Sequence, residues 1–362
     1  LAWSERDAGA TRLAVVEEHE DGRVERLSYQ ALRERVALLK GLEEKVVDTV
    51  IAERITLTPG GRQLIQTMRA HGAHTALVTP FLDGQVAWAD LRKLVDFQIK
   101  EGIDGLISVG TTGESPTLDY DEHIAVIAKT VEYAAGRVPV MAGTGSNATT
   151  EALDLTKRAD EAGADAFLLV APYYNKPSQE GLYRHFSLLA ECTAKPIMLY
   201  SIPGRCGIEI TVETVVRLRQ KHRNIIGIKE AGGQVDKAAR LVRELDPEFL
   251  VLSGDDSLTV AFGEVGGQGI ISVASNWLPG PVAQLAALVR QKKFAEAKVL
   301  QGKLAEIFKT LFIEPNPVPV KHVMQRSGLI QSGEVRLPLC EMSDANRLLV
   351  EACADVTLAN LR

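Results

Sequence analysis

The chain lacks the marks of several classes of protein. Its 362 residues contain no apolar run long enough to cross a membrane. Its beginning, LAWSERDAGATR, lacks the basic and then apolar order of a secretory signal. The net charge of −6 is mild and no basic stripe occurs, so nucleic acid is not an expected partner. These absences favour a globular protein of the cytoplasm.

Disulfide and metal chemistry also lack support. Cys192, Cys206, Cys340 and Cys353 are scattered without paired spacing. This fits reduced thiols in a cytosol better than a disulfide framework or a zinc site. The seven histidines include no HExxH pair. We therefore expect no metal site.

From His74 onward, short apolar runs alternate with amphipathic stretches, as in βα units. The expected strands are residues 75–79, 105–109, 138–142, 166–170, 197–200, 225–229, 249–252 and 269–273. The expected helices are residues 88–101, 121–135, 150–162, 179–192, 212–220, 235–244, 257–265 and 279–291. This alternation predicts an α/β fold, a (β/α)8 TIM barrel over residues 74–291. A doubly wound open sheet is the alternative, but no GxGxxG follows the first run.

Two segments flank the expected barrel. Residues 292–362 predict a C-terminal helical layer, with helices over 294–311 and 343–360 and the Pro-punctuated stretch EPNPVPVKHVMQRSGLI between them. Residues 1–73 predict a short, mostly helical N-terminal appendage. Its expected helices are residues 27–42, with Ser28 as a possible N-cap, then 43–53 and 62–70.

Two pieces of the appendage resemble fragments of other families. LSYQALRERVALL resembles a segment of AMP-forming acyl-CoA ligases, and ITLTPGGRQLIQTMRAHGAHTALV resembles part of a phosphoserine phosphatase of the haloacid dehalogenase superfamily. Neither piece brings a catalytic motif. A fused origin and a plain packed appendage both stay open, and we assign the segment no chemistry.

A lysine ends one of the expected buried strands. NIIGIKEAGG, residues 224–233, places Lys229 after a β-branched run. Burial removes solvation from an amine and lowers its pKa, and a neutral amine attacks a carbonyl to form a Schiff base. The alternative is a lysine whose stem is buried and whose ammonium reaches solvent.

Polar residues follow the neighbouring runs, at the barrel face that holds active sites. GTTGES, residues 110–115, offers backbone N–H groups and hydroxyls suited to a carboxylate or phosphate. Tyr200 ends the fifth run and suits proton relay, although a tyrosine there is more often a packing residue. Arg205 follows with a planar fork suited to a second carboxylate. Asp255 and Asp256 suggest a metal or, more simply, a helix cap.

Taken together, these residues favour a Schiff-base enzyme that acts on small carboxylated carbonyl compounds. The motifs GTTGESPTL, AGTGSN, PYYNKPSQEGLYRHF, LYSIPGRCG, NIIGIKEAGG, LSGDD and GIISVAS occur in order and at barrel spacing. They closely resemble the dihydrodipicolinate synthase family of class I pyruvate-dependent aldolases, from about His74 to the C-terminus.

The resemblance implies a lyase that condenses pyruvate with L-aspartate 4-semialdehyde to give 4-hydroxy-tetrahydrodipicolinate. This is the first step of diaminopimelate and lysine biosynthesis. The resemblance implies no metal or organic cofactor, because the lysine becomes the electron sink once it is a protonated iminium.

The resemblance also implies site residues. Lys229 matches the Schiff-base lysine and Tyr200 the proton-relay tyrosine. The other matching positions are Thr111 and Thr112 in the relay and at the pyruvate carboxylate, Tyr174 contributed across a tight dimer interface, Arg205 at the semialdehyde carboxylate, Ile271 with its carbonyl facing the lysine, and Gly254 at the substrate.

The loop after the fifth strand departs from the family pattern YN-x-P-x-RTG. Ser201 and Cys206 replace the usual Asn and Thr, and we expect the backbone shape to survive while substrate choice could shift. Sibling N-acetylneuraminate lyases and sugar-acid aldolases lack an arginine at this position, so Arg205 favours the synthase. A pyruvate lyase that cleaves a 2-keto-3-deoxy acid or N-acetylneuraminate is the alternative function. A non-catalytic barrel would predict a lost Lys229 or Tyr200.

The family's lysine feedback site lies at the dimer interface. Tyr120 stands where a histidine is often found, and the matching positions are Ser115, His123, Asn147, Glu151 and Tyr173. The resemblance implies inhibition by L-lysine and a homo-oligomer, a dimer of tight dimers. The alternative for His123 and Glu151 is ordinary polarity of a solvated helix face.

Overall fold

The computed structural model describes residues 13–18, 24–28 and 72–361. The chain divides into two compact units, Leu1–Thr56 and Leu57–Arg362. In the first unit, β1 (Leu13–Glu18) pairs antiparallel with β2 (Val24–Ser28). Leu27 and Ser28, expected to begin a helix, instead end β2. The rest of that helix and the other two expected before residue 71 lie outside the described residues, and a domain boundary at residue 73 stays a prediction.

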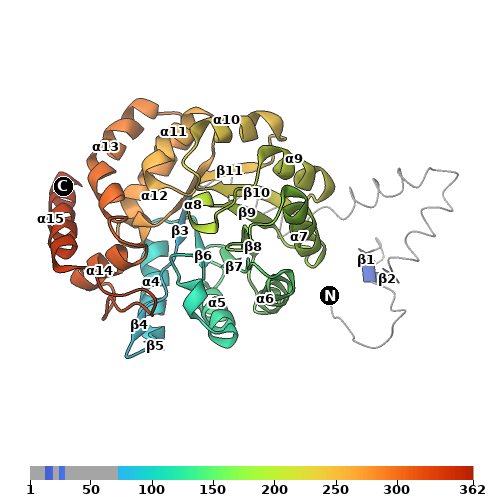
Figure 1. The fold of residues 1–362 in the computed structure, drawn as a ribbon, viewed down its shortest axis with the longest axis horizontal. Coiled ribbons are helices and arrows are strands. Elements are labelled where there is room, and N and C mark those ends of the chain that lie inside the picture. The colour runs from blue at the N-terminus through green and yellow to red at the C-terminus, as the bar shows by residue number, and fades with distance from the viewer. Residues whose placement is uncertain (1–12, 19–23, 29–71, 362) are drawn as a thin grey trace. The chain divides into compact units, whose positions relative to one another are not determined.

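Eight parallel strands of the second unit close into a barrel (Figure 1). In chain order they are β3 (Ala73–Ala76), β6 (Gly105–Ser108), β7 (Val140–Gly143), β8 (Ala166–Val170), β9 (Ile197–Ser201), β10 (Ile225–Glu230), β11 (Leu250–Ser253) and β12 (Gly269–Ser272). β12 returns to pair with β3. The predicted (β/α)8 barrel is therefore confirmed, and the open sheet is excluded.

The first strand lies earlier than expected, at 73–76 rather than 75–79. Leu77 N still donates to Ile107 O at 3.0 Å, but Val78 N donates to the side chain of Asn276 at 3.0 Å. Because that amide hydrogen goes to a side chain, the strand ladder ends there.

Helices follow the strands and cover the barrel (Figure 1). They are α4 (Trp88–Lys100), α5 (Tyr120–Ala134), α6 (Thr149–Glu161), α7 (Gln179–Glu191), α9 (Val212–Lys221), α10 (Val235–Glu244), α11 (Thr259–Glu264) and α12 (Pro279–Arg290). Short elements interrupt the loops: the hairpin β4 (Phe81–Leu82) and β5 (Gln85–Val86), η1 (Ser115–Thr117), α8 (Pro203–Cys206), η2 (Asp256–Leu258) and η3 (Ala274–Asn276).

Strand β10 shows how sequence positions the lysine. Ile225 and Ile228 pack between the sheet and the helices, whereas Ile226 packs inside the barrel. The register with β9 shifts between Ile225 and Gly227. A Cβ on Gly227 would lie 2.6 Å from the Leu250 carbonyl oxygen, so this position requires glycine. Since side chains alternate along a strand, Lys229 after the outward Ile228 faces the interior.

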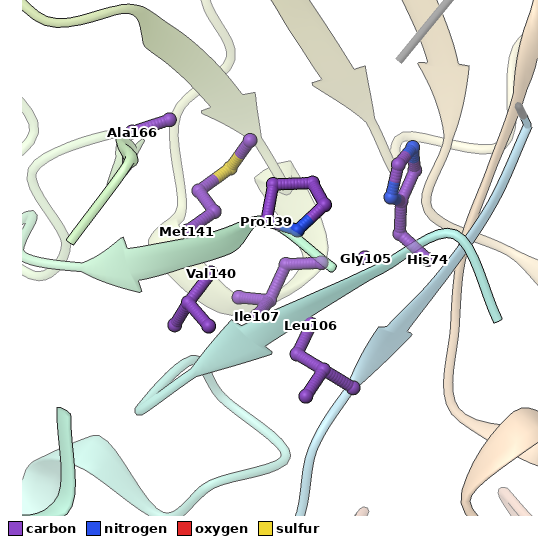
Figure 2. A pocket seen from close by; sticks show the side chains of 8 residues that line it. All are labelled: His74, Gly105, Leu106, Ile107, Pro139, Val140, Met141 and Ala166. Atoms are coloured by element: carbon purple, nitrogen blue, oxygen red, sulfur yellow. The ribbon is translucent and has the colours of Figure 1, made fainter. Parts of the chain in front are cut away.

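The amino-terminal end of the barrel is closed by packing. Figure 2 shows the residues around a cavity at the starts of β3, β6, β7 and β8, among them His74, Gly105 and Met141. The cavity holds about 10 Å³, room for roughly one water. A Cβ on Gly105 would lie 2.7 Å from His74 Nδ1, so the glycine admits the histidine ring.

A C-terminal layer lies beside the barrel (Figure 1). α13 (Phe294–Thr310) packs on α11 and α12, and α15 (Asp344–Leu361) packs on α13 and on α14 (Val318–Arg326). α13 and α15 lie where helices were expected, but α14 lies inside the Pro-punctuated stretch. Proline in a first helical turn is tolerated, because its missing N–H has no intrahelical partner there. Within the described part of the chain, no helix is long and apolar enough to span a membrane.

Candidate active site

Lys229 and Tyr200 lie side by side at the carboxyl ends of two neighbouring strands. They are register partners in the β10–β9 pairing, and Lys229 Nζ lies 4.4 Å from the centroid of the Tyr200 ring. Lys229 is only 5% exposed. The alternative of an ammonium that reaches solvent is therefore wrong.

The surroundings shift both groups. Burial lowers the pKa of Lys229 to about 8; the charge of Arg205 also lowers it, and Asp256 opposes the shift. Burial raises the pKa of Tyr200 to about 12, against a side-chain hydrogen bond with Thr111 and the charge of Arg205. Near neutral pH, the lysine is therefore within reach of its neutral form, while the tyrosine keeps its proton.

The β11–α11 loop makes room for the lysine. A Cβ on Gly254 would lie 2.9 Å from Lys229 Cε and 2.6 Å from the Ala231 side chain. Glycine at 254 therefore lets the backbone pass close to the amine.

The two aspartates after β11 have separate structural roles. Asp255 accepts from Ser257 N at 2.9 Å and caps η2, so the helix-cap interpretation is confirmed for Asp255. Asp256 is buried and accepts from Val273 N at 3.0 Å and Ala274 N at 3.1 Å. It ties this loop to the end of β12, which sequence reasoning missed. Among the described residues, no three His, Cys, Asp or Glu side chains gather as a metal site.

The GTTGES loop brings Thr111 and Thr112 to the same end of the barrel. Thr111 reaches the Tyr200 hydroxyl, and Thr112 is buried. Thr112 Oγ1 accepts a hydrogen bond of 3.0 Å from Asn316 Nδ2, in the loop before α14. Sequence analysis did not single out Asn316; its only local signal is an amide among the prolines of EPNPVP.

The remaining substrate-site candidates differ in exposure. Arg205 is exposed on α8, near enough to Lys229 and Tyr200 for its charge to act on both. Ile271 is buried among the side chains inside the barrel. Tyr174 is 88% exposed and has φ of 73°, so in this single chain it does not pack into the site.

The two departures from the family pattern are both buried. Cys206 is 3% exposed, and burial raises the pKa of its thiol to about 11. Ser201 Oγ accepts from Ile210 N at 3.3 Å and from Lys237 Nζ at 3.4 Å. Both departures therefore lie buried close to Arg205 in the chain, and neither side chain is exposed to solvent.

Only some of the residues predicted for the lysine feedback site contact one another. The Tyr120 hydroxyl and Ser146 Oγ both donate to the Glu151 carboxylate. His123 is 3% exposed, with Nε2 at 2.8 Å from the Gly143 carbonyl, so the solvated-face alternative is wrong for His123. Asn175 Nδ2 donates to the Asn147 carbonyl at 2.9 Å.

The last two members of that set flank the others. Ser115 begins η1 just before α5, and Tyr173 is 37% exposed in the loop after β8. Sequence analysis did not single out Ser146 as a partner of Glu151.

Fold and site together define a (β/α)8-barrel enzyme with its active site at the carboxyl ends of the strands. The model of the Dihydrodipicolinate synthetase family matches residues 69–356. The chain belongs to this family, and it is a lyase.

Relatives found by sequence and by structure carry the same enzyme name, 4-hydroxy-tetrahydrodipicolinate synthase. The chain is 46% identical over 275 residues to 4-hydroxy-tetrahydrodipicolinate synthase of Persephonella marina, covering 76% of this chain and 94% of that protein. The structure of the synthase from Methylacidiphilum fumariolicum SolV matches with a TM-score of 0.79 and 49% identity, covering 80% of this chain and 97% of that one.

Two further solved relatives carry small molecules. The chloride-inhibited enzyme of Acinetobacter baumannii is complexed with pyruvate; its TM-score is 0.77 at 42% identity, covering 79% of this chain and 98% of that one. The enzyme of Cyanidioschyzon merolae has lysine bound; its TM-score is 0.78 at 35% identity, covering 80% of this chain and 98% of that one.

Proposed function

We propose that this chain condenses pyruvate with L-aspartate 4-semialdehyde to give 4-hydroxy-tetrahydrodipicolinate, the opening step of diaminopimelate and lysine biosynthesis. The observation that carries the proposal is the buried Lys229, whose Nζ lies 4.4 Å from the Tyr200 ring and whose pKa is lowered to about 8. Relatives that share the family bear the synthase name, and one of them is a complex with pyruvate.

The proposed chemistry runs through the lysine. The neutral amine of Lys229 adds to the C2 carbonyl of pyruvate and water leaves, which forms an iminium. Loss of a proton from the methyl group gives an enamine, whose carbon attacks the aldehyde carbon of the semialdehyde. The amino group of that substrate then displaces Lys229 from the iminium carbon and closes the ring. Tyr200, protonated at neutral pH, delivers and receives protons at the lysine-bound carbon and oxygen.

The other residues hold the two substrates in this scheme. Thr112 and the backbone of its loop donate to the pyruvate carboxylate, and Arg205 receives the semialdehyde carboxylate through its guanidinium. Thr111 links Tyr200 to the rest of the relay. Gly254 leaves room for the amine. By the family resemblance, the backbone carbonyl of Ile271 is assigned to face the amine in this scheme. The iminium is the electron sink, so the proposed reaction uses no metal or organic cofactor.

We test the proposal by intact mass after adding pyruvate and borohydride. The wild type should gain a reduced pyruvate adduct, and Lys229→Ala should not. Lys298→Ala is the matched control: it makes the same substitution at a lysine whose side chain is 59% exposed and whose Nζ lies 2.6 Å from Glu264. That variant should keep the adduct, whereas a wild type without any adduct contradicts the mechanism.

A coupled assay then separates the aldehyde partners. With aspartate semialdehyde and the downstream reductase, turnover should follow addition of pyruvate. An adduct-forming protein that turns over N-acetylneuraminate or a 2-keto-3-deoxy acid instead would favour the alternative lyase.

We also propose a homo-oligomer in which Tyr174 serves the neighbouring site. An 88% exposed tyrosine held at φ of 73° supports this, since an exposed aromatic in a left-handed conformation gains nothing within its own chain. A second chain that covers it would bury the ring. The proposed assembly is a dimer of such dimers.

Inhibition by L-lysine is proposed for the Glu151 cluster, on the support of a relative with lysine bound. Glu151 is the acidic member of the set, and the Tyr120 and Ser146 hydroxyls orient it. Millimolar lysine should slow the wild type, and Glu151→Gln should remove the inhibition while leaving the KM for pyruvate unchanged. Glu132→Gln, on an exposed face of α5, should stay inhibited. Wild-type turnover that ignores lysine contradicts the proposal.

A further inference from the structure

The loop that carries Thr111 and Thr112 is flanked by residues in an unfavourable backbone conformation. Val109 has φ of 56° and Glu114 has φ of 57°, so non-glycine residues on both sides of the threonines adopt the left-handed region. For a β-branched residue such as Val109 this conformation is costly and persists only where the surroundings impose it.

The C-terminal layer supplies contacts from outside the barrel. The Lys321 ammonium of α14 donates to the Glu114 carboxylate, and both side chains are fully buried. Arg336 N donates to the same carboxylate at 3.0 Å. The Arg336 guanidinium donates to the Thr117 carbonyl at 3.0 Å and to Glu122 at 2.6 Å and 2.7 Å. The loop is therefore anchored after Thr112 by residues more than 200 positions away.

Asn316 contacts the loop at the threonine itself. It is 5% exposed, and its Nδ2 donates to Thr112 Oγ1 at 3.0 Å. Its Oδ1 is buried without a hydrogen-bond partner among the described residues. A hydroxyl that accepts from an amide still has its own hydrogen to donate. Asn316 thus leaves Thr112 as a donor, and a carboxylate can only accept.

We propose that Asn316 is a positioning residue that keeps the Thr112 hydroxyl oriented as a hydrogen-bond donor to the carboxylate of pyruvate. The inference rests on the proposed function, because pyruvate is the substrate it invokes. If this role is correct, the C-terminal layer is part of the pyruvate site. The Lys321–Glu114 pair holds the loop in place, and Asn316 orients the Thr112 hydroxyl on it.

The test compares two near-isosteric variants. Asn316→Asp presents an ionised carboxylate, which takes the Thr112 hydrogen for itself and adds a negative charge near pyruvate. Its KM for pyruvate should rise about tenfold or more, with a smaller change in kcat. Asn316→Leu neither donates nor accepts, so its KM should rise less than that of the aspartate variant. A purely structural role predicts that the effect of Asn316→Asp on KM is the same with and without the Thr112 hydroxyl, which the double mutant below measures.

A pH series and a double mutant sharpen the comparison. As pH falls, the carboxylate that Asn316→Asp introduces becomes protonated and can donate again, so the KM of this variant should approach that of the wild type. In a Thr112→Val background, Asn316→Asp should raise KM by less than it does alone, because the hydroxyl it acts through is gone. Ser327→Ala removes another bond between this layer and the barrel, the 2.9 Å contact with Trp277 Nε1, and should leave KM unchanged.

The outcomes separate the two proposals. A wild type that forms no pyruvate adduct contradicts the proposed function. A wild type that turns over normally, with Asn316→Asp binding pyruvate as tightly as the wild type, overturns the role of Asn316 alone. If the aspartate variant does not fold, as judged by thermal unfolding, an unchanged pyruvate KM in Asn316→Leu also overturns it, since loss of the donor must cost binding.

Discussion

The amine of Lys229 lies 4.4 Å from the centroid of the Tyr200 ring, across the register of β10 and β9. Neighbouring parallel strands bring residues from separate βα units within reach at their carboxyl ends. Burial acts on both residues in opposite directions. It lowers the pKa of the Lys229 amine to about 8 and raises the pKa of the Tyr200 phenol to about 12, so the phenol keeps its proton near neutral pH.

The pH dependence of turnover should follow Lys229. Its pKa is lowered to about 8, first by burial and then by the charge of Arg205. Because only the neutral amine attacks pyruvate, kcat/KM should rise with pH through about 8 and level off above it. In Arg205→Ala the positive charge is lost, so the rise should move to higher pH, whereas Arg205→Lys should keep it. A profile that is flat across this range would contradict the assignment.

Removal of the Tyr200 hydroxyl should slow the chemistry. Tyr200→Phe keeps the ring beside Lys229 but cannot move protons, so kcat should fall about 10²- to 10⁴-fold. Tyr183→Phe is the control, because Tyr183 stacks under Arg217 with 4.1 Å between guanidinium carbon and ring centroid. Steady-state kinetics check both variants. Equal kcat for Tyr200→Phe and the wild type would remove Tyr200 from the relay.

Removal of only one partner of the buried Lys321–Glu114 pair should destabilise the protein. Lys321→Met leaves a buried carboxylate without its cation, which costs about 3–5 kcal/mol of unfolding free energy. The double variant Glu114→Gln with Lys321→Met should recover part of that loss, because no uncompensated charge remains. Urea unfolding measures both.

An exposed pair gives the control for that series. Lys129 and Glu132 are 44% and 58% exposed at their side chains, and Lys129→Ala should leave the unfolding midpoint where it is. If Lys321→Met is as stable as the wild type, the pair does not support the threonine loop.

Mixed oligomers test whether Tyr174 serves a neighbouring chain. Tyr174→Phe and Lys229→Ala should each be nearly inactive alone. After unfolding and refolding together, half of the dimers are mixed and each has one complete site, so about a quarter of wild-type activity should return. Mixing Tyr174→Phe with Tyr200→Phe should restore activity in the same way, and failure of both mixtures would place Tyr174 in its own chain's site.

The sequence alone determined the barrel and its central residues. Buried parallel strands are apolar on both faces, so they appear as short continuous runs, and the observed strands β6 to β12 begin within two residues of those expected. Lys229 was visible because a charge at the end of such a run is unusual. Tyr200 was visible for a related reason, since the carboxyl ends of barrel strands converge on one site. Gly254 was assigned only through the family resemblance.

Only the tertiary structure decided the pairings between distant parts of the chain. Asn316 meets Thr112 and Lys321 meets Glu114 across more than 200 residues, and such contacts leave no periodic signal in either segment. Local patterns also misjudged β2, where Leu27 and Ser28 pair with Val15 and Leu13 of β1. The same short sequence can form either a hairpin strand or the start of a helix. Here the strand forms because the neighbouring strand supplies the hydrogen-bond partners.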